Sequence, residues 1–152
     1  FNTLRQEERD STALHIRMQW ATASAGLLKE AGLHRREGGA WLPNHLLCCL
    51  HAVHGRTLMP ALQLIDENKV TRVTSPSGRW LYRVSGSSGV PYLCLPGSSY
   101  CPCPAYKYTV ILRRDAVLCK HVLAARLATE MGLAVQKQVT DQELADIIAG
   151  MD

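Results

Sequence analysis

Apolar residues in the first part of the chain recur at the spacing of a helix. Between residues 11 and 31 they are three or four positions apart, which places them on one narrow stripe of a helix. The members of this stripe are Leu14, Met18, Ala21, Ala25 and Leu28. Asp10 or Ser11 is suited to cap the start, and Gly32 to end the helix. A stripe this rich in small residues predicts close packing on another helix, either in the chain's own core or on a partner protein.

Two more helices are predicted after a polar, glycine-bearing linker at residues 34–40. The first covers residues 43–54, with Pro43 and Asn44 at its start and Gly55 at its stop. The second covers residues 57–67. Thr57 is its cap, and the proline at position 60 lies in its first turn, where a missing N–H costs little.

The hydrophobic period then changes to two, which indicates strands at residues 69–74, 79–85 and 90–95. Ser75-Pro76-Ser77-Gly78 has the composition of a type I turn, and residues 86–89 form the next connection. These segments predict an antiparallel β-meander. Residues 106–112 are expected to add a further short strand.

Helical spacing returns at residues 116–131, with Gly132 as the stop. The last helix begins at Thr140, where Thr140 and Glu143 form a capping box. The predicted fold is therefore α+β: a small antiparallel meander flanked by helices. We divide the chain into residues 1–40, a helical extension or a segment derived from another or partner chain, and a domain at residues 41–152.

Composition and charge narrow the class of protein. Of 152 residues 47% are apolar, which is enough for a sizeable core, and the net charge of +4 is too mild to make nucleic-acid binding the default interpretation. No apolar run is long enough for a membrane span. Cys48 and Cys49 are adjacent, which disfavours a compact disulfide framework, so the six cysteines favour a reduced, intracellular protein.

The sequence carries one constellation with metal-binding chemistry. Cys101 and Cys103 flank a proline, and Cys119 and His121 follow after a gap of fifteen residues, in the first two turns of the predicted helix 116–131. Three thiolates and one imidazole fill all four positions of tetrahedral zinc. The pattern predicts one structural Zn²⁺ and leaves no open position for water or substrate.

Two other arrangements could supply metal ligands. Cys94 is an alternative ligand for the same site. A second metal site is also conceivable on the predicted helix at residues 43–54. There, histidines and cysteines three or four positions apart share a face, namely His45, Cys48, Cys49 and His51. For that second group we favour buried cysteines beside surface histidines. The chain has no phosphate-binding G-x-x-x-x-G-K-[ST] loop and no clear Cys–His catalytic arrangement, which predicts a protein that is not an enzyme and has no small-molecule substrate.

The C-x-C…C-x-H pattern resembles the SWIM zinc-binding domain. Residues 73–79 and 118–124, with the segment between them, look like the small SWIM-domain proteins of the Shu-complex family, and the resemblance covers about residues 43–150. It implies a zinc-bound ββα unit at about residues 90–131, in which Ala124 belongs to the motif. It also implies a nuclear role in homologous recombination DNA repair, in a heterodimer with a RecA-like recombinase paralogue. That complex would bind single-stranded DNA and support recombinase filament assembly.

Aromatic and basic residues interleave around the metal motif, as in surfaces that stack bases and pair with phosphates. The predicted DNA contacts are Arg79, Lys107, Arg113, Arg114 and Lys120. The alternative is a solvated face above core tyrosines. Two other functions therefore remain open, a stand-alone nucleic-acid-binding zinc module and a pure protein-interaction domain without DNA contact.

Overall fold

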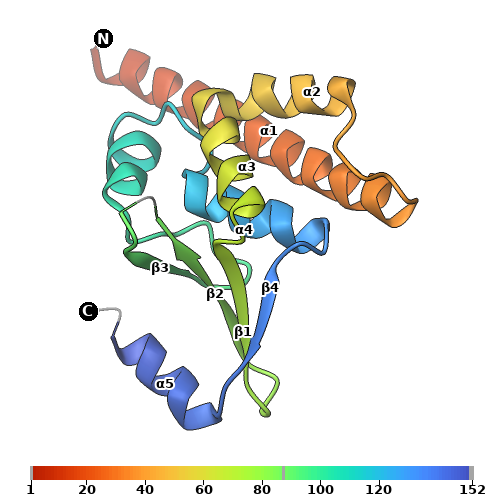
Figure 1. Cartoon of the computed structure of the whole chain (residues 1–152). Helices are drawn as coiled ribbons and strands as arrows, with labels where there is room; N and C mark the ends of the chain where they lie inside the picture. Colours follow the sequence, from red (N-terminus) through yellow and green to blue (C-terminus); the bar gives the residue numbers. More distant parts are fainter. Residues whose placement is uncertain (1, 87, 151–152) are drawn as a thin grey trace.

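The computed structural model describes residues 2–86 and 88–150, with side chains from Asp10 onward. A four-stranded sheet in the order β3-β2-β1-β4 separates a layer of helices, α1 to α4, from the single helix α5 (Figure 1). The helices are α1 (Asn2–Arg36), α2 (Asn44–His54), α3 (Leu58–Asp66), α4 (Lys120–Glu130) and α5 (Asp141–Ala149), with the short turns η1 (Gly55–Thr57) and η2 (Tyr106–Leu112). The strands are β1 (Val70–Thr74), β2 (Trp80–Ser85), β3 (Pro91–Cys94) and β4 (Val135–Gln138).

Three strands form the predicted meander. β1 and β2 are antiparallel, with Arg72 opposite Tyr82, and β2 and β3 are antiparallel, with Tyr82 opposite Cys94. The turn between β1 and β2 closes where the amide of Gly78 donates to the carbonyl of Ser75 at 3.0 Å. Gly78 has a φ of 79°, a conformation that favours glycine. In the next connection, Ser87 lies outside the described residues.

The fourth strand makes the sheet mixed instead of purely antiparallel. β4 pairs in parallel with β1, with Thr71 opposite Val135. All four residues of β4 are exposed, and its sequence Val-Gln-Lys-Gln has only one apolar position. This strand is therefore held by backbone pairing at the sheet edge and carries no alternating hydrophobic pattern.

Two predicted elements near the metal motif differ in the structure. Residues 106–112 are not a strand but a π-type helical segment, in which the amide of Arg113 donates to the carbonyl of Tyr108 at 2.9 Å. α4 begins at Lys120, not at residue 116, because Cys119 is extended, with ψ at 163°. Cys119 is thus the N-cap of α4, and only His121 lies within its first turn.

Gly32 does not end the first helix. It is buried where α1 crosses α4, and a Cβ at Gly32 would lie 2.8 Å from the carbonyl oxygen of Glu130. Glycine is required there for the close approach of two helices, and α1 continues to Arg36. Of the predicted stripe only Leu28 is buried, while the members from Leu14 to Ala25 are exposed.

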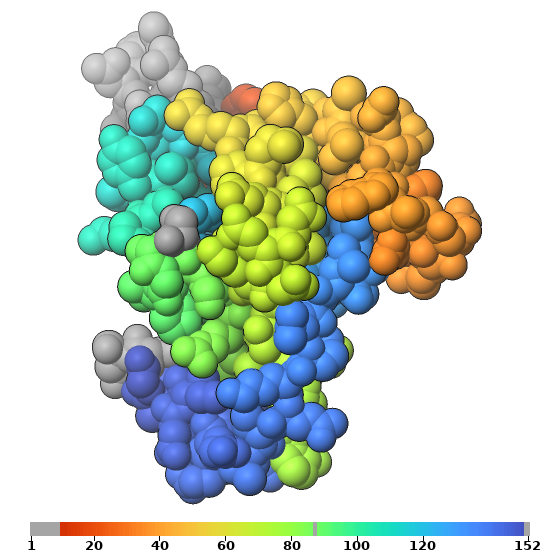
Figure 2. All heavy atoms as spheres, viewed as in Figure 1, coloured from red at the N-terminus to blue at the C-terminus, as the bar shows by residue number. Residues whose placement is uncertain are grey.

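Two clusters of buried residues hold the layers together. The larger lies between the helical layer and the sheet and includes Leu28 and Ala31 of α1 beside residues of α2, α3 and α4. The smaller joins Leu144 of α5 to Val73 and Leu81 on the opposite sheet face, so that α5 covers the lower end of the sheet in the view shown (Figure 2).

The division at residue 40 stays a prediction. In the described part of the chain, no helix is both long and apolar enough to cross a membrane.

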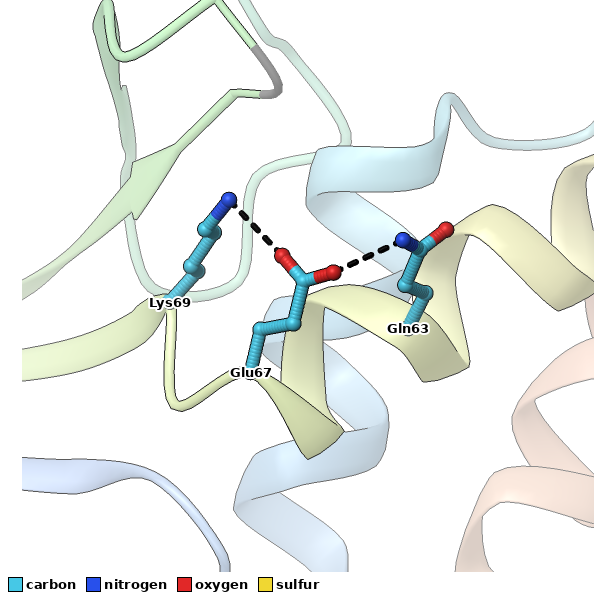
Figure 3. A network of polar contacts seen from close by, with 3 residues as sticks. All are labelled: Gln63, Glu67 and Lys69. Atoms are coloured by element: carbon cyan, nitrogen blue, oxygen red, sulfur yellow. Dashed lines mark hydrogen bonds and ion pairs between the residues drawn. The ribbon is translucent and has the colours of Figure 1, made fainter.

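The junction between α3 and β1 is closed by a polar network (Figure 3). The Gln63 amide donates to Glu67 at 2.7 Å, and the Lys69 ammonium lies 2.7 Å from the other Glu67 oxygen. Hydrogen bonds to its carboxylate hold the pKa of Glu67 below its ordinary value, with the larger effect from Lys69 and the smaller from Gln63. The predicted capping box of α5 is also confirmed, because the amide of Glu143 donates to Thr140 Oγ1 and the amide of Thr140 donates to Glu143.

A buried histidine makes the stability of the chain depend on pH. Nε2 of His54 lies 3.1 Å from the hydroxyl oxygen of Ser24, which joins α2 to α1. Burial, with a smaller contribution from the positive charge of Arg126, lowers the pKa of His54 from 6.5 to about 4. The unfolded chain therefore takes up a proton in a range where the folded chain does not. The His54 contribution is complete above pH 6.5 and is lost as the pH falls towards 4.

Between pH 6.5 and pH 4, we expect protonation of His54 to lower the free energy of unfolding by about 3 kcal/mol. Urea unfolding of the wild type and of His54→Gln at pH 7 and pH 4.5 measures this contribution. Other groups also titrate in this range, so the difference between the two proteins isolates His54. Equal losses of stability in both proteins on acidification would show that His54 is not the group responsible.

Candidate metal centre

Two short segments deliver the predicted metal ligands. Cys101 and Cys103 lie in the connection between β3 and η2, where Pro102 and Pro104 restrict the backbone and lower the entropy lost on ordering. Cys119 and His121 lie at the N-terminal end of α4, where unpaired backbone N–H groups favour negative charge. The two segments meet beside the sheet because α4 packs on β2 and β3.

The structure brings all four predicted ligands together. Their Sγ and imidazole nitrogen atoms lie within 4.8 Å of one another, and each of the four side chains is at most 3% exposed. Sγ of Cys101 is 3.8 Å from Nδ1 of His121. Tetrahedral zinc with Zn–S bonds of about 2.3 Å places its ligand atoms about 3.8 Å apart. The residues therefore fit a zinc ion, and a donor set without carboxylates does not suit calcium or magnesium.

The three thiols share hydrogen bonds that favour one thiolate. The thiols of Cys101 and Cys119, together with the Tyr106 amide at 3.3 Å, lower the pKa of Cys103 well below its usual range. The interaction with Cys103 raises the pKa of Cys101, and the interactions with Cys101 and Cys103 raise that of Cys119. Zinc binds cysteines as thiolates, so metal binding would release the thiol protons, which couples its affinity to pH.

The imidazole of His121 packs against an aromatic ring of β3. The ring of Tyr92 lies 4.4 Å from it between centroids, at an angle of 34°. A Cβ at Gly86 would lie 3.1 Å from the Tyr92 ring and 3.5 Å from Nε2 of His121, so glycine allows the chain to close over the ring. Nε2 is buried without a hydrogen-bond partner among the described residues, and Nδ1 faces the sulfurs. Sequence reasoning missed Tyr92 and Gly86, because only the paired strands bring them to His121.

The other candidate residues around the motif have different positions. Ala124 is fully buried in the main core, on the same helix as His121. Cys94 is buried, but it is not part of the group of four ligands. Within the described residues, the second candidate set forms no metal cluster, and its four members on α2 are exposed, namely His45, Cys48, Cys49 and His51. The expectation that Cys48 and Cys49 are buried is wrong, since they face solvent on α2.

The predicted DNA contacts fall into separate places. Lys107, Arg113 and Arg114 are exposed on η2 and just after it, and Lys120 is half-buried at the start of α4. Arg113 forms an ion pair with Asp115 at 2.9 Å and lies over the ring of Tyr108.

Arg79 is exposed at the opposite end of the sheet from η2. It follows the turn between β1 and β2, which contacts α5 through the amide of Ser77 and the carboxylate of Asp141 (Figure 1). Three of the five predicted DNA contacts therefore lie together, namely Lys107, Arg113 and Arg114, and Arg79 lies apart from them.

A four-ligand cluster of three cysteines and one histidine, set between a strand connection and the start of a helix in an α+β fold, defines a zinc-finger protein of the SWIM type. The chain belongs to the zinc finger SWIM domain-containing protein 7 family. It is 44% identical to the zebrafish (Danio rerio) protein of that name over 108 residues, which cover 71% of this chain and 77% of that protein. It is 41% identical to the mouse protein over 122 residues, 80% of each chain, and 40% identical to the human protein over 109 residues, 72% of this chain and 78% of that protein.

Two further comparisons give no match. No protein-family model matches the chain, and no solved structure matches it significantly.

Proposed function

We propose that this chain is a non-catalytic adaptor in homologous recombination, in which one zinc ion stabilises the fold. The observation that carries this proposal is the closed metal centre. The four buried ligands would fill all the positions of a tetrahedral zinc ion and would leave none for water or substrate. Such a metal holds segments of the chain together, and function then depends on the surfaces that it positions.

The partner and location follow from the resemblance to the Shu-complex family. The chain pairs with a RecA-like recombinase paralogue in the nucleus, and the complex binds single-stranded DNA and supports assembly of the recombinase filament. The exposed side chains of Lys107 and Tyr108 support a DNA contact on η2, because they combine positive charge with an aromatic ring. Arg113, just after η2, lies over the Tyr108 ring and is also paired with Asp115. Arg79 is too far from this group to belong to the same contact.

Charge reversal on η2 tests the DNA contact. In the purified complex, we expect Lys107→Glu with Arg113→Glu to weaken single-strand binding roughly tenfold at moderate salt. The slope of log K against log salt should fall by about 0.7 for each phosphate that the protein no longer neutralises. Fluorescence anisotropy with a labelled oligonucleotide, over a series of salt concentrations, measures both effects.

A matched variant separates local contact from overall charge. Arg56→Glu with Lys137→Glu makes the same change in net charge at exposed positions on η1 and β4. If both double variants weaken binding equally, the effect is one of net charge and the η2 contact is wrong. Unchanged DNA binding in both would favour an adaptor that contacts only protein.

A further inference from the structure

The first half of α1 extends beyond the core that holds its second half. Between residues 10 and 23 this helix has no buried side chain, and Leu14, Ile16, Met18 and Trp20 are exposed. Helix propensity alone gives a segment of this length little stability in water. Ile16 and Trp20 are four residues apart and share one exposed face of this helix, with Leu14 at its edge, and such an apolar face marks a surface that another molecule covers.

This part of α1 forms one wall of a groove of about 530 Å³. Ala13, Ile16 and Trp20 of α1 are three or four residues apart and face Ala52 and Val53 of α2 across the groove. Residues 114–117, between η2 and α4, complete the lining. We call this hollow, lined by these residues with Leu14 and Arg17, the α1 groove. Its apolar walls suit one face of an amphipathic helix.

η2 extends the apolar surface next to the groove. The guanidinium of Arg17 donates to the carbonyl of Val110 at 2.7 Å, which fixes η2 against α1. On the side that remains open, η2 exposes Ile111 and Leu112. η2 also forms an outer margin of the molecule in the space-filling view (Figure 2).

The charges in the α1 groove indicate the chemistry of its occupant. Arg17 and Arg114 line it, and among the described side chains neither forms an ion pair. Asp115 also lines it, but its charge is offset by Arg113. Two arginines beside apolar walls are complementary to a segment that has both apolar side chains and carboxylates. A DNA strand would bring phosphates but would leave Leu14, Ile16 and Trp20 uncovered.

We propose that the α1 groove docks an amphipathic helix of the protein partner, with apolar residues on one face and acidic residues beside them. The inference rests on the proposed pairing with a RecA-like recombinase paralogue, and it assigns the surface and the chemistry of that contact. Arg114 then binds a partner carboxylate and not a phosphate.

The test uses the full chain co-expressed with the RecA-like paralogue of the same organism. Leu14→Glu places a carboxylate beside the groove, and Met59→Glu is its matched control, because Leu14 and Met59 are 63% and 64% exposed and both lie on helices. We expect Leu14→Glu to raise the Kd of the complex at least tenfold and Met59→Glu to change it less than twofold. Arg114→Asn removes the charge in a left-handed backbone conformation, φ 57°, that asparagine tolerates, and it should raise the Kd and reduce its dependence on salt.

Circular dichroism and zinc content establish that each variant is folded. A folded Leu14→Glu chain that binds the paralogue as tightly as the wild type would overturn the docking surface while leaving the pairing intact. The docking surface is also overturned if Leu14→Glu and Arg114→Asn weaken single-stranded DNA binding but not paralogue binding, because the α1 groove would then bind nucleic acid. A wild-type chain that binds no such paralogue contradicts the proposed function, and the inference fails with it.

Discussion

Replacing Cys103 by serine is expected to abolish zinc binding and unfold the chain around the metal centre. Cys103 is buried, and it is the sulfur on which the other two thiols and the Tyr106 amide converge. In small zinc peptides the metal supplies about 10–16 kcal/mol of apparent free energy. A whole domain is stable by only about 5–15 kcal/mol, so losing the metal removes most or all of this margin.

The measurement combines zinc content with circular dichroism and urea unfolding, and Cys49→Ser is the control. Cys49 is exposed on α2 and belongs to no metal cluster among the described residues. Its replacement should change the free energy of unfolding by no more than about 0.5 kcal/mol. A Cys103→Ser protein that lacks zinc and yet unfolds at the same urea concentration as the wild type would refute a structural role for the metal.

The second large effect is expected at Leu123 on α4. This side chain is 0% exposed in the main core, and its amide donates to the carbonyl of Cys119 at 3.0 Å. Leu123→Ala should lower the free energy of unfolding by about 2–5 kcal/mol, because it removes buried apolar groups and leaves a cavity. The position of Leu123, one turn from a metal ligand, means that the affinity for zinc should fall as well.

Leu112→Ala is the matched control, because Leu112 is 63% exposed on η2. Its removal in the isolated chain should change stability by less than about 0.5 kcal/mol. Urea titration of both variants, with zinc bound and after treatment with a chelator, separates the effect of the cavity from the effect of the metal. Equal destabilisation of the two variants would show that α4 does not pack as the structure has it.

Features that depend on a few neighbouring residues could be predicted from the sequence. The turn from Ser75 to Gly78 fixes the first hairpin, and the capping box from Thr140 to Glu143 fixes the start of α5. The metal ligands are also recognisable from their local spacing, and the structure brings them together. The turn and the cap each lie within four residues, and each pair of ligands lies within three, although the packing of α4 on the sheet is what brings the two pairs together.

Other elements depend on contacts that the sequence does not show. Residues 106–112 are rich in β-branched and aromatic side chains, which favour a strand, yet they form a π-type helix that α1 contacts through Arg17 and the Val110 carbonyl. β4 has no apolar alternation to mark it as a strand, and its pairing with the edge of β1 does not show in the sequence. Gly32 has the residue type of a helix stop, but its neighbour Glu130 on α4 gives it another role.

The parallel pairing of β4 with β1 has a consequence for the order in which the chain folds. β1 and β4 are separated by the rest of the meander, both ligand segments and the whole of α4. The entropy of closing so long a loop is smaller once its middle is already ordered. Capture of the metal between Cys101 and His121 shortens the effective loop, so the sheet can be completed after the ion is bound. Zinc bound during synthesis would then slightly lower the entropic cost of adding the last strand to the sheet.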